Sequence, residues 1–389
     1  MKSRWRWPRR LLGLVLLGLV FTRACGPGIV DRRLNGVLDP GPYAPSADAR
    51  KLHATLAVSD LHADSLLWGR DLLERGTHGQ VDVPRLIEAN VALQGFFLVT
   101  HTPRGLNIYK NDDSTDNITP LALFQGWPMA TWTSRKARAL YLAGRLSAFA
   151  DASQGRFTLI RSRADLKTYL ERRTREPHIT AGFLGVEGAH CLDGDLNALD
   201  ELFAAGVRVV APTHFHDNFL GGSASGATKG GLTPAGKQLI AMIEQRHMLV
   251  DLAHASPAVV SDVLALAKRP VLVSHTGVRG TADNPRNLSD EQLIGVARTG
   301  GVVGIAFFDT AVGGTDYAHV VRAIKHAVSK IGADHVALGS DFDGAVQTQT
   351  DTTGLPLLTE ELIKGGFAEA DIRNIMGGNV LRLLGEQLP

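Results

Sequence analysis

The sequence predicts an α/β protein, a (β/α)8 barrel of the TIM type that follows an N-terminal export or anchor segment. Three observations lead to this prediction. Eight short apolar or β-branched runs are spread along residues 51–389. Most of them are continuously apolar, as expected for parallel strands covered on both faces. Helical patterns separate the runs, and eight strand–helix units indicate a barrel.

A doubly wound open sheet is the alternative arrangement for the same alternation of elements. No Gly-x-Gly-x-x-Gly motif follows the first expected strand, so dinucleotide binding has no support. The eight expected strands are Thr55–Asp60, Ala92–Thr100, Ala181–Val186, Val207–Thr213, Met248–Ala253, Pro270–Ser274, Gly301–Phe307 and His335–Gly339.

Capping signals mark several of the helices between these strands. Ser256-Pro257 and Thr233-Pro234 each place an N-cap residue before a proline at the first helical position. Ser289 with Gln292 forms a capping box. Gly206 and Gly300 stand where a left-handed residue would end a helix.

The first thirty residues predict export from the cytoplasm. Met1–Arg10 is basic, and Leu11–Phe21 is an apolar run that is too short for a relaxed membrane span but suits a signal peptide. Cleavage, lipid attachment at Cys25 and retention as an anchor all stay open. We therefore expect residues 1–30 to be a signal peptide or membrane anchor, residues 31–50 a linker, and residues 51–389 the barrel domain. The expected location is the periplasm or the cell surface.

Composition excludes several other classes of protein. The 389 residues are 44% hydrophobic and 21% charged, the balance of a soluble folded chain. Two cysteines cannot build a disulfide framework or a four-cysteine zinc site. The net charge is +2, but residues 1–30 hold six basic residues and no acid, so the remainder is slightly acidic. No basic field indicates a nucleic-acid partner.

Polar residues follow almost every expected strand at the point where it ends. In a barrel, catalytic groups come from the C-terminal ends of the strands. His62 and Asp64 follow the first strand two positions apart, so they share one face of an extended backbone. The other residues at strand ends are Glu187, His214, His254, His275 and Asp341.

Each of these residues also has a structural interpretation, because a lone histidine is usually hydrogen-bonded and a lone acid often caps a helix. As a set they favour a metal site. Carboxylates that converge in one barrel mouth repel each other, and divalent cations offset that cost. Imidazole and carboxylate ligands together suit Zn²⁺. The spacing alone therefore predicts metal binding and leaves a binuclear site open.

The motifs at the strand ends resemble, in order and spacing, those of the membrane (renal-type) dipeptidases, and the chain looks like a bacterial-type member. This is a family of zinc metallopeptidases with a (β/α)8 barrel and two zinc ions. The resemblance runs from about Ser59 to the C-terminus. The motifs are His62-Ala63-Asp64, Val186-Glu187-Gly188-Ala189-His190, Thr213-His214, Gly231-Leu232-Thr233-Pro234-x-Gly236, Asp251-Leu252-Ala253-His254-Ala255-Ser256, Ser274-His275, Arg286-Asn287, Asp341-Phe342-Asp343-Gly344 and Gly378-Asn379.

The resemblance implies a set of metal ligands. His62 and Asp64 would bind one zinc ion, and His254 and His275 would bind the other. Glu187 would bridge the two ions through its carboxylate oxygens. A hydroxide held between the two metals would attack the peptide carbonyl.

The resemblance also implies the substrate contacts. His214 would bind substrate and stabilise the oxyanion, and Arg286 would hold the C-terminal carboxylate. Asp341 would take a proton from the attacking water and pass it to the leaving amine. A site that holds both termini would favour dipeptides. Members of the family often accept a D-residue at the C-terminal position, and many are homodimers; the sequence leaves both points open for this chain.

Five further residues near these motifs carry no ligand role. His101 follows a strand without a counterpart in the family pattern. His190 is expected to be structural, and His216 to be a loop or substrate contact. Asp343 is expected to support the turn beyond Asp341. We expect Cys191 to be a free thiol. The glycines at 221, 222 and 226 suggest a flexible lid, although surface turns explain them equally well.

Two other functions keep the same architecture. Amidohydrolases and phosphotriesterases use related barrels and metals, but their usual bridging ligand is a carboxylated lysine, whereas Glu187 takes that place here. A surface-anchored binding barrel that has lost catalysis is the other alternative. All five expected ligands and Asp341 are present, which favours an enzyme.

Overall fold

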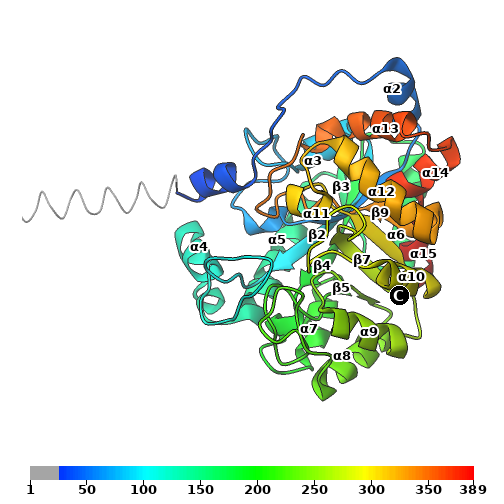
Figure 1. Ribbon diagram of the computed structural model, residues 1–389. Coiled ribbons are helices and arrows are strands. Elements are labelled where there is room, and N and C mark those ends of the chain that lie inside the picture. The colour runs from blue at the N-terminus through cyan, green and yellow to red at the C-terminus, as the bar shows by residue number, and fades with distance from the viewer. Residues whose placement is uncertain (1–25) are drawn as a thin grey trace, which may run out of the picture.

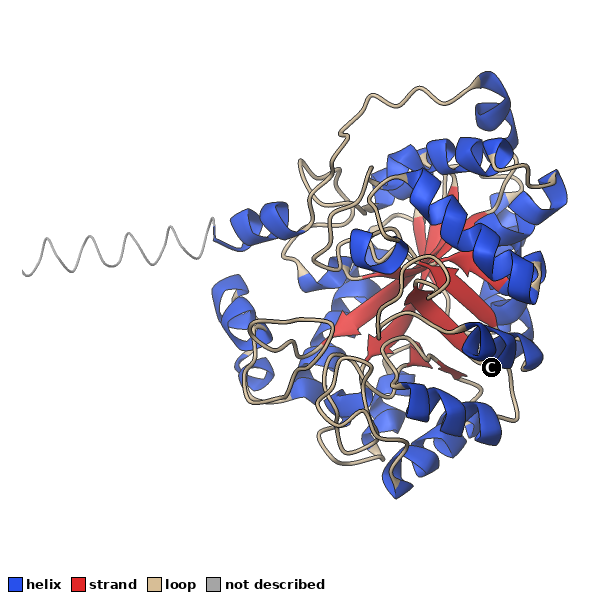
Figure 2. Cartoon of the chain, viewed as in Figure 1, coloured by secondary structure: helices blue, strands red, loops and turns tan. Residues whose placement is uncertain are grey.

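A curled parallel sheet forms the centre of the molecule, and helices surround it (Figure 1, Figure 2). The computed structural model describes residues 26–389. Around the sheet the strand order is β6-β5-β4-β2-β1-β9-β8-β7. A further strand, β3, pairs with β4 and is not part of this order. The strands are β1 Val58–Ala63, β2 Val91–Val99, β3 Phe157–Leu159, β4 Thr180–Glu187, β5 Val207–Val210, β6 Leu249–Val250, β7 Leu272–Thr276, β8 Val302–Ile305 and β9 Val336–Leu338.

The two outermost strands of that order also approach each other. An isolated parallel bridge joins Asp251, directly after β6, to Leu272 at the start of β7. The Leu252 N–H donates to the Leu272 carbonyl at 2.9 Å. The sheet therefore has a TIM-like curl, and the carboxyl ends of its strands meet at one mouth.

The predicted eight-stranded parallel α/β architecture is confirmed. Each of the eight expected runs overlaps with a strand, although the bounds of most differ by a few residues. β3 is an addition that the sequence analysis did not predict, because it has only three residues between two helices. It pairs with residues 180–182 at the start of β4, on the edge that pairs with β5 further along the strand.

The capping predictions are also confirmed. The hydroxyls of Ser256 and Thr233 accept from backbone N–H groups in their first helical turns, and Ser289 with Gln292 forms a capping box. Gly206 and Gly300 have positive φ. The helices are α2 Ala47–His53, α3 Val83–Glu88, α4 Ile118–Gln125, α5 Arg135–Ala152, α6 Arg163–Arg173, α7 Ala198–Ala204, α8 Pro234–Gln245, α9 Pro257–Leu266, α10 Asp290–Arg298, α11 Asp309–Val312, α12 Tyr317–Ile331, α13 Leu355–Lys364, α14 Glu369–Arg373 and α15 Asn379–Gln387.

The chain that precedes α2 lies against the domain. Residues 26–34 are helical, and the Asp31 carboxylate pairs with Arg70 at 2.9 Å. Val37 forms a parallel bridge with Thr348. In residues 26–389 no helix is long and apolar enough to cross a membrane. The predicted export signal and Cys25 lie outside the described residues, and the domain boundaries stay predictions.

Two apolar layers hold the sheet. One lies between the sheet and the surrounding helices, and the other fills the inside of the curl with residues such as Leu61, Phe97 and Phe183. Val380 and Leu384 of α15 join the inner layer. The segment just before α15 packs against the start of β1, so the C-terminal helix covers the amino ends of the strands. The opposite end is left for the polar residues.

Close packing inside the curl predicts opposite effects for one substitution at two glycines. A Cβ at Gly95 in β2 would overlap the Leu61 carbonyl oxygen, whereas a Cβ at Gly144 in α5 would meet open space. Gly95→Ala should lower the free energy of unfolding by about 2 kcal/mol or more, because the backbone must move. Gly144→Ala should raise it by about 0.5–1 kcal/mol, because alanine stabilises a helix interior. Thermal and denaturant unfolding would measure both, and equal effects would contradict this account of the packing.

Candidate metal centre

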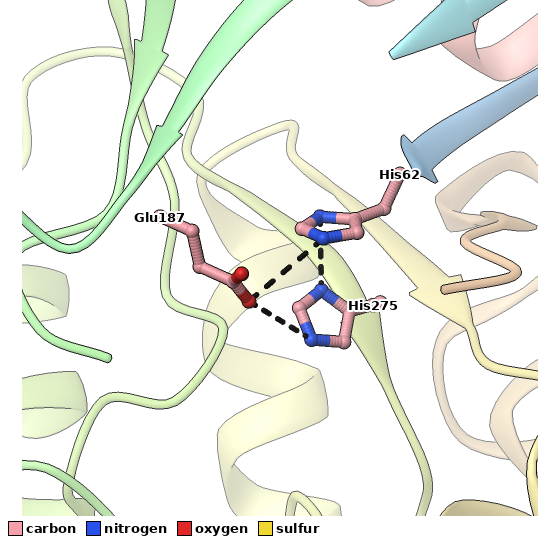
Figure 3. A group of neighbouring side chains, drawn as sticks. All are labelled: His62, Glu187 and His275. Atoms are coloured by element: carbon pink, nitrogen blue, oxygen red, sulfur yellow. Dashed lines mark hydrogen bonds and ion pairs between the residues drawn. The ribbon is translucent and has the colours of Figure 1, made fainter. Parts of the chain in front are cut away.

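The carboxyl ends of the strands bring together imidazoles and carboxylates that are far apart in the sequence. His62 lies in β1, Glu187 ends β4, and His275 lies in β7, and their side chains point toward one another (Figure 3). Each is at most 2% exposed. Three groups of donor atoms lie within 4.8 Å of one another. They are His62, Glu187 and His275; Glu187, His214 and His254; and His62, Asp64 and Asp341.

Glu187 is the centre of two of these groups. Its Oε1 lies 2.9 Å from His254 Nε2, 3.5 Å from His275 Nε2 and 3.8 Å from His62 Nε2. Its Oε2 lies 3.4 Å from His214 Nε2. One carboxylate therefore faces four imidazoles that come from four different strand ends.

His62 joins this arrangement to two further acids. Its Nε2 lies 3.4 Å from Asp64 Oδ1 and 3.8 Å from Asp341 Oδ1. His62 thus stands between Glu187 on one side and Asp64 with Asp341 on the other. All five residues predicted as metal ligands, together with Asp341, lie in one continuous cluster.

The cluster carries more negative than positive charge. Burial raises the pKa of Glu187 well above its ordinary value, and the charges of Asp64 and Asp341 raise it further. Burial likewise raises the pKa of Asp64. Burial is also the main cause that raises the pKa of Asp341 to about 8. The charge of the Arg286 guanidinium opposes the shifts of Glu187 and Asp341.

The imidazoles have the opposite shift. Burial is the largest cause that lowers the pKa of His62, His254 and His275, and the Arg286 charge lowers each of them further. Neutral imidazoles keep a nitrogen lone pair for a metal.

Several donor atoms of the cluster lack a hydrogen-bond partner in residues 26–389. They include His62 Nε2, Asp64 Oδ1, Glu187 Oε2 and His254 Nδ1. Buried polar atoms without a partner cost free energy, and buried carboxylates repel one another. A divalent cation would relieve both costs. The donor set of imidazole nitrogen and carboxylate oxygen therefore fits zinc.

Ser274 orients two of the imidazoles. Its hydroxyl lies 3.0 Å from His62 Nδ1 and 3.0 Å from His275 Nδ1. A hydroxyl can donate to one ring and accept from the other. Ser274 stands beside His275 in the sequence, but its role becomes visible only once β7 is placed in the curl, where the hydroxyl reaches back to His62 in β1.

Two buried aspartates, also without an assigned role in the sequence analysis, hold the strand ends that carry the ligands. Asp60 Oδ1 accepts from the Ser340 N–H at 2.8 Å, and Asp60 Oδ2 accepts from the Ser340 hydroxyl at 2.5 Å, which ties β1 to the loop after β9. Asp251 Oδ1 accepts from the N–H groups of Ala253 at 2.9 Å and Ser274 at 2.8 Å, which ties the loop after β6 to β7. The ligand-bearing loops are therefore fixed by carboxylates one layer below the site.

Two of the site residues have an unusual backbone conformation. His254 has a φ of 61° and Asp341 a φ of 63°, in the left-handed region that favours glycine. Such conformations cost of order 1 kcal/mol each and occur often at functional sites. Here they turn the chain sharply at a strand end, so that a side chain can face the mouth.

The remaining predicted site residues also lie at the mouth. Arg286 is buried, and its guanidinium donates to the His275 carbonyl at 3.0 Å and contacts His275 Nε2 at 2.7 Å. The His214 ring packs edge-on against that of His254, with centroids 4.5 Å apart. Both face the cluster, as the resemblance implies for substrate contacts.

The predictions for Asp343 and Cys191 are confirmed. The Asp343 carboxylate accepts from the Ser65 hydroxyl at 2.6 Å and from the Gln80 N–H at 2.7 Å, and it pairs with Arg70 at 2.6 Å. It therefore supports the turn after β9. Cys191 is a free, buried thiol whose pKa is raised by burial.

Comparison with known proteins agrees with this site. A model of the family described as membrane dipeptidase (peptidase family M19) matches residues 46–388. Dipeptidase VerJ of Clonostachys rogersoniana is 35% identical over 211 residues, which cover 52% of this chain and 54% of that protein. An uncharacterized protein in the pqqA 5′ region of Klebsiella pneumoniae is 34% identical over 247 residues, which cover 60% of this chain and 89% of that protein. The chain thus spans about half the length of the Clonostachys relative.

A solved structure shows the same fold. The metallopeptidase from Rhodobacter sphaeroides, liganded with a phosphinate mimic of the dipeptide L-Ala-D-Ala, is 26% identical and has a TM-score of 0.70. The match covers 86% of this chain and all of that chain.

The position of Ser274 predicts an effect on metal affinity. Ser274→Ala removes the hydrogen bonds to His62 Nδ1 and His275 Nδ1. The zinc affinity should fall by about 10–100-fold, as is typical when a group that orients a ligand is lost. Competition with a chromophoric chelator would measure it. Ser225→Ala is the matched control, because the buried Ser225 hydroxyl has no partner in the described part of the chain; equal affinities for the two variants would refute the orienting role.

The raised pKa of Asp341 predicts that the metal-free protein loses stability as the pH rises from 7 to 8. With a pKa of about 8 in the folded chain, Asp341 holds its proton there, whereas the unfolded chain, with a pKa near 3.8, has released it. The folded state binds more protons, so its stability falls by about 1 kcal/mol for this group. The site imidazoles stay neutral in the folded chain but are about one-quarter protonated at pH 7 in the unfolded chain, so each of them offsets this loss by about 0.1 kcal/mol.

Denaturant unfolding of chelator-treated protein at several pH values would measure this loss. Asp341→Asn should reduce the dependence, and added zinc should suppress it because zinc favours ionised carboxylates. A pH dependence as large in Asp341→Asn as in the unchanged protein would contradict the assigned charge state.

Proposed function

The chain belongs to the membrane dipeptidase family, peptidase family M19, and on that basis we propose that it hydrolyses dipeptides at a binuclear zinc centre. The observation that carries the proposal is the position of Glu187, whose two carboxylate oxygens face imidazoles from four strand ends. A carboxylate in that position suits a bridging ligand. His62 with Asp64 would hold one ion, and His254 with His275 the other.

The two zinc ions, when bound, would offset the converging carboxylates, polarise a carbonyl group and make water a stronger nucleophile. The protein's own contribution is to fix the ligands before substrate arrives. Ser274 orients His62 and His275, and the buried aspartates below them hold the loops. Preorganised groups of this kind need no reorganisation during the reaction.

Asp341 is the proposed proton carrier. Its pKa of about 8 places its charge change near neutral pH, where a group can both accept and return a proton. Its Oδ1 lies 3.8 Å from His62 Nε2, beside the proposed metal ligands. It would take a proton from the attacking water and give it to the leaving amine.

His214 and Arg286 are the proposed substrate contacts. His214 is neutral because burial lowers its pKa, so its ring can donate one hydrogen bond to the carbonyl oxygen as negative charge develops there. Arg286 can bind a carboxylate through paired hydrogen bonds. Arg286 would hold the C-terminal carboxylate, and a substrate fixed by that carboxylate would have no further residue beyond it.

The substrate proposal extends to stereochemistry. The Rhodobacter metallopeptidase binds a mimic of L-Ala-D-Ala, and we propose that this chain also accepts a D-residue at the C-terminal position. We further propose that the sheet is a closed (β/α)8 barrel, that the protein acts in the periplasm or at the cell surface, and that it forms homodimers. The basic residues and apolar run at the N-terminus support the location, as a signal peptide, a retained anchor or a site of lipid attachment.

A panel of dipeptides tests the proposed function. L-L and L-D dipeptides, a tripeptide and an N-acetylated dipeptide would be offered to residues 31–389 with and without chelator. Free dipeptides alone should be cleaved, with loss of activity in chelator and recovery on addition of Zn²⁺. Protein that holds two metals but cleaves none of the dipeptides would favour another amide or ester substrate, or a binding barrel without catalysis.

Asp341→Asn separates proton transfer from metal binding. The variant should keep its zinc and lose about 10²–10⁴-fold in kcat, because the amide cannot accept and return a proton. Metal analysis and steady-state kinetics on one preparation would measure both. Asp48→Asn on the exposed face of α2 is the control and should keep full activity. An unchanged kcat in Asp341→Asn would remove Asp341 from the mechanism.

A further inference from the structure

A second group of histidines lies beside the metal centre and takes no part in it. His101 follows β2, His190 lies in the 3-10 turn Ala189–Leu192 after β4, and His216 lies in the loop after β5. The ring centroids are 4.5 Å apart for His101 and His216, 5.1 Å for His190 and His216, and 5.8 Å for His101 and His190. Each residue is at most 2% exposed. We call these three residues the histidine cluster.

Most ring nitrogens of the histidine cluster have no protein partner in residues 26–389. These are both nitrogens of His101, both nitrogens of His216 and Nδ1 of His190. The remaining nitrogen, His190 Nε2, lies 3.0 Å from the Thr100 hydroxyl. A neutral imidazole carries one N–H donor. His101 and His216 therefore present two buried donors that no protein acceptor satisfies, which is costly and calls for a ligand with acceptor atoms.

The spacing and charge around the histidine cluster favour an anion over a metal ion. Its three rings are not among the groups whose donor atoms lie within 4.8 Å of one another, so they are too spread to share one ion as they stand. Arg135, at the start of α5, adds a positive charge that lowers the pKa of all three histidines. A fixed positive charge opposes a cation and attracts a carboxylate.

The acidic residues nearby do not cancel this positive charge. Asp116 pairs with Arg138 at 2.7 Å. Asp217 accepts hydrogen bonds from its own loop. Asp112 and Asp113 are exposed to solvent, where their charges are screened.

The position of the histidine cluster indicates which part of a substrate would reach it. Three strands separate β2 from β7 in either direction around the curled sheet. His101 after β2 thus lies across the mouth from Arg286 after β7, and His216 stands two residues beyond His214. With the C-terminal carboxylate on Arg286 and the carbonyl at His214, the N-terminal residue of the substrate points toward the histidine cluster.

We propose that His101, His190, His216 and Arg135 form a subsite that selects dipeptides whose N-terminal residue has a carboxylate side chain. This inference rests on the proposed dipeptidase function. The carboxylate would accept hydrogen bonds from the N–H groups of His101 and His216 and lie in the field of Arg135. His190, held at Thr100, would position the other two rings.

The preference for charge is tested with substrates that differ in charge but not in size. The zinc-loaded enzyme should cleave Glu-Ala with at least a tenfold higher kcat/KM than Gln-Ala. The difference should appear mainly in KM, because it reflects binding of a side chain remote from the bond that breaks. Equal values for the two substrates would overturn the proposal.

Variants assign the preference to the proposed residues. Arg135→Met should reduce the Glu-Ala to Gln-Ala ratio about tenfold, and Arg135→Lys should restore part of it by keeping the charge. His216→Phe should reduce the ratio, whereas His216→Gln should retain more of it because its amide keeps an N–H donor. A merely structural role would change both substrates alike and would not distinguish the members of each pair.

Two control variants test whether the loss of a nearby cation or of another histidine changes the Glu-Ala to Gln-Ala ratio. Lys136→Ala removes the neighbouring cation of the same helix, which faces Glu201 at 2.8 Å, and the ratio should not change. His335→Asn alters a half-buried histidine that bonds to Gly301 at the amino ends of the strands, and the ratio should again be unchanged. If either control shifted the ratio as much as the subsite variants, the assignment would be wrong.

Failure of this inference differs from failure of the proposed function. An enzyme that cleaves dipeptides without preference for Glu-Ala keeps the dipeptidase function and loses the subsite. An enzyme that cleaves no dipeptide fails the proposed function and with it the inference. Metal analysis adds a further check, because a third zinc equivalent that is lost in His216→Phe would show a metal site and overturn the anion assignment.

Discussion

The structure is built around carboxylates that converge at one end of a sheet. Glu187, Asp64 and Asp341 are buried at the mouth, and burial together with repulsion from neighbouring carboxylates raises the pKa of each. Such an arrangement is unfavourable unless cations compensate it, so the scaffold must hold it in place by other means. The inner apolar layer and the C-terminal helix at the amino ends of the strands supply that stability far from the mouth. Stability and the candidate site are therefore located at opposite ends of the sheet, the arrangement that (β/α)8 barrels also have.

The polar groups beneath the site explain how the ligands keep their orientation. Asp60 and Asp251 bind backbone N–H groups of neighbouring strand ends, and Ser274 contacts two imidazoles at once. Left-handed backbone at His254 and Asp341 completes the turn into the mouth. Asp60, Asp251 and Ser274 each join a different pair of strands. The site thus depends on the correct curl of the whole sheet, and a change in register would separate its members.

Much of this architecture follows from sequence patterns, and the part that does not has a physical reason. Apolar runs identify eight strands because both faces of each strand are buried, and the residues directly after them, such as Glu187 and Asp341, can be placed in one mouth from the rule for parallel sheets alone. β3 cannot be predicted in this way, because three residues are too few to show a periodic pattern. The roles of Ser274 and the histidine cluster cannot be predicted from the sequence, because they depend on which strands are neighbours. His101, for example, follows β2 in the sequence, but its proposed role depends on contact with His216, which is 115 positions further along the chain.

The glycines of the loop after β5 show how closely that loop is packed. The interpretation of residues 221, 222 and 226 as a flexible lid is not needed to explain them, since a Cβ at Gly222 would overlap the backbone of Gly230 and one at Gly226 would overlap the Asp217 carboxylate. The same loop is tied to the segment after β2, because the Asn111 N–H donates to the Ser225 carbonyl at 2.8 Å and the Asn111 side chain donates to it at 3.0 Å. Two chain segments therefore interlock beside the proposed metal ligands. Close packing, rather than freedom to move, therefore explains these glycines, and hydrogen bonds to the segment after β2 hold the loop that follows His214 in place.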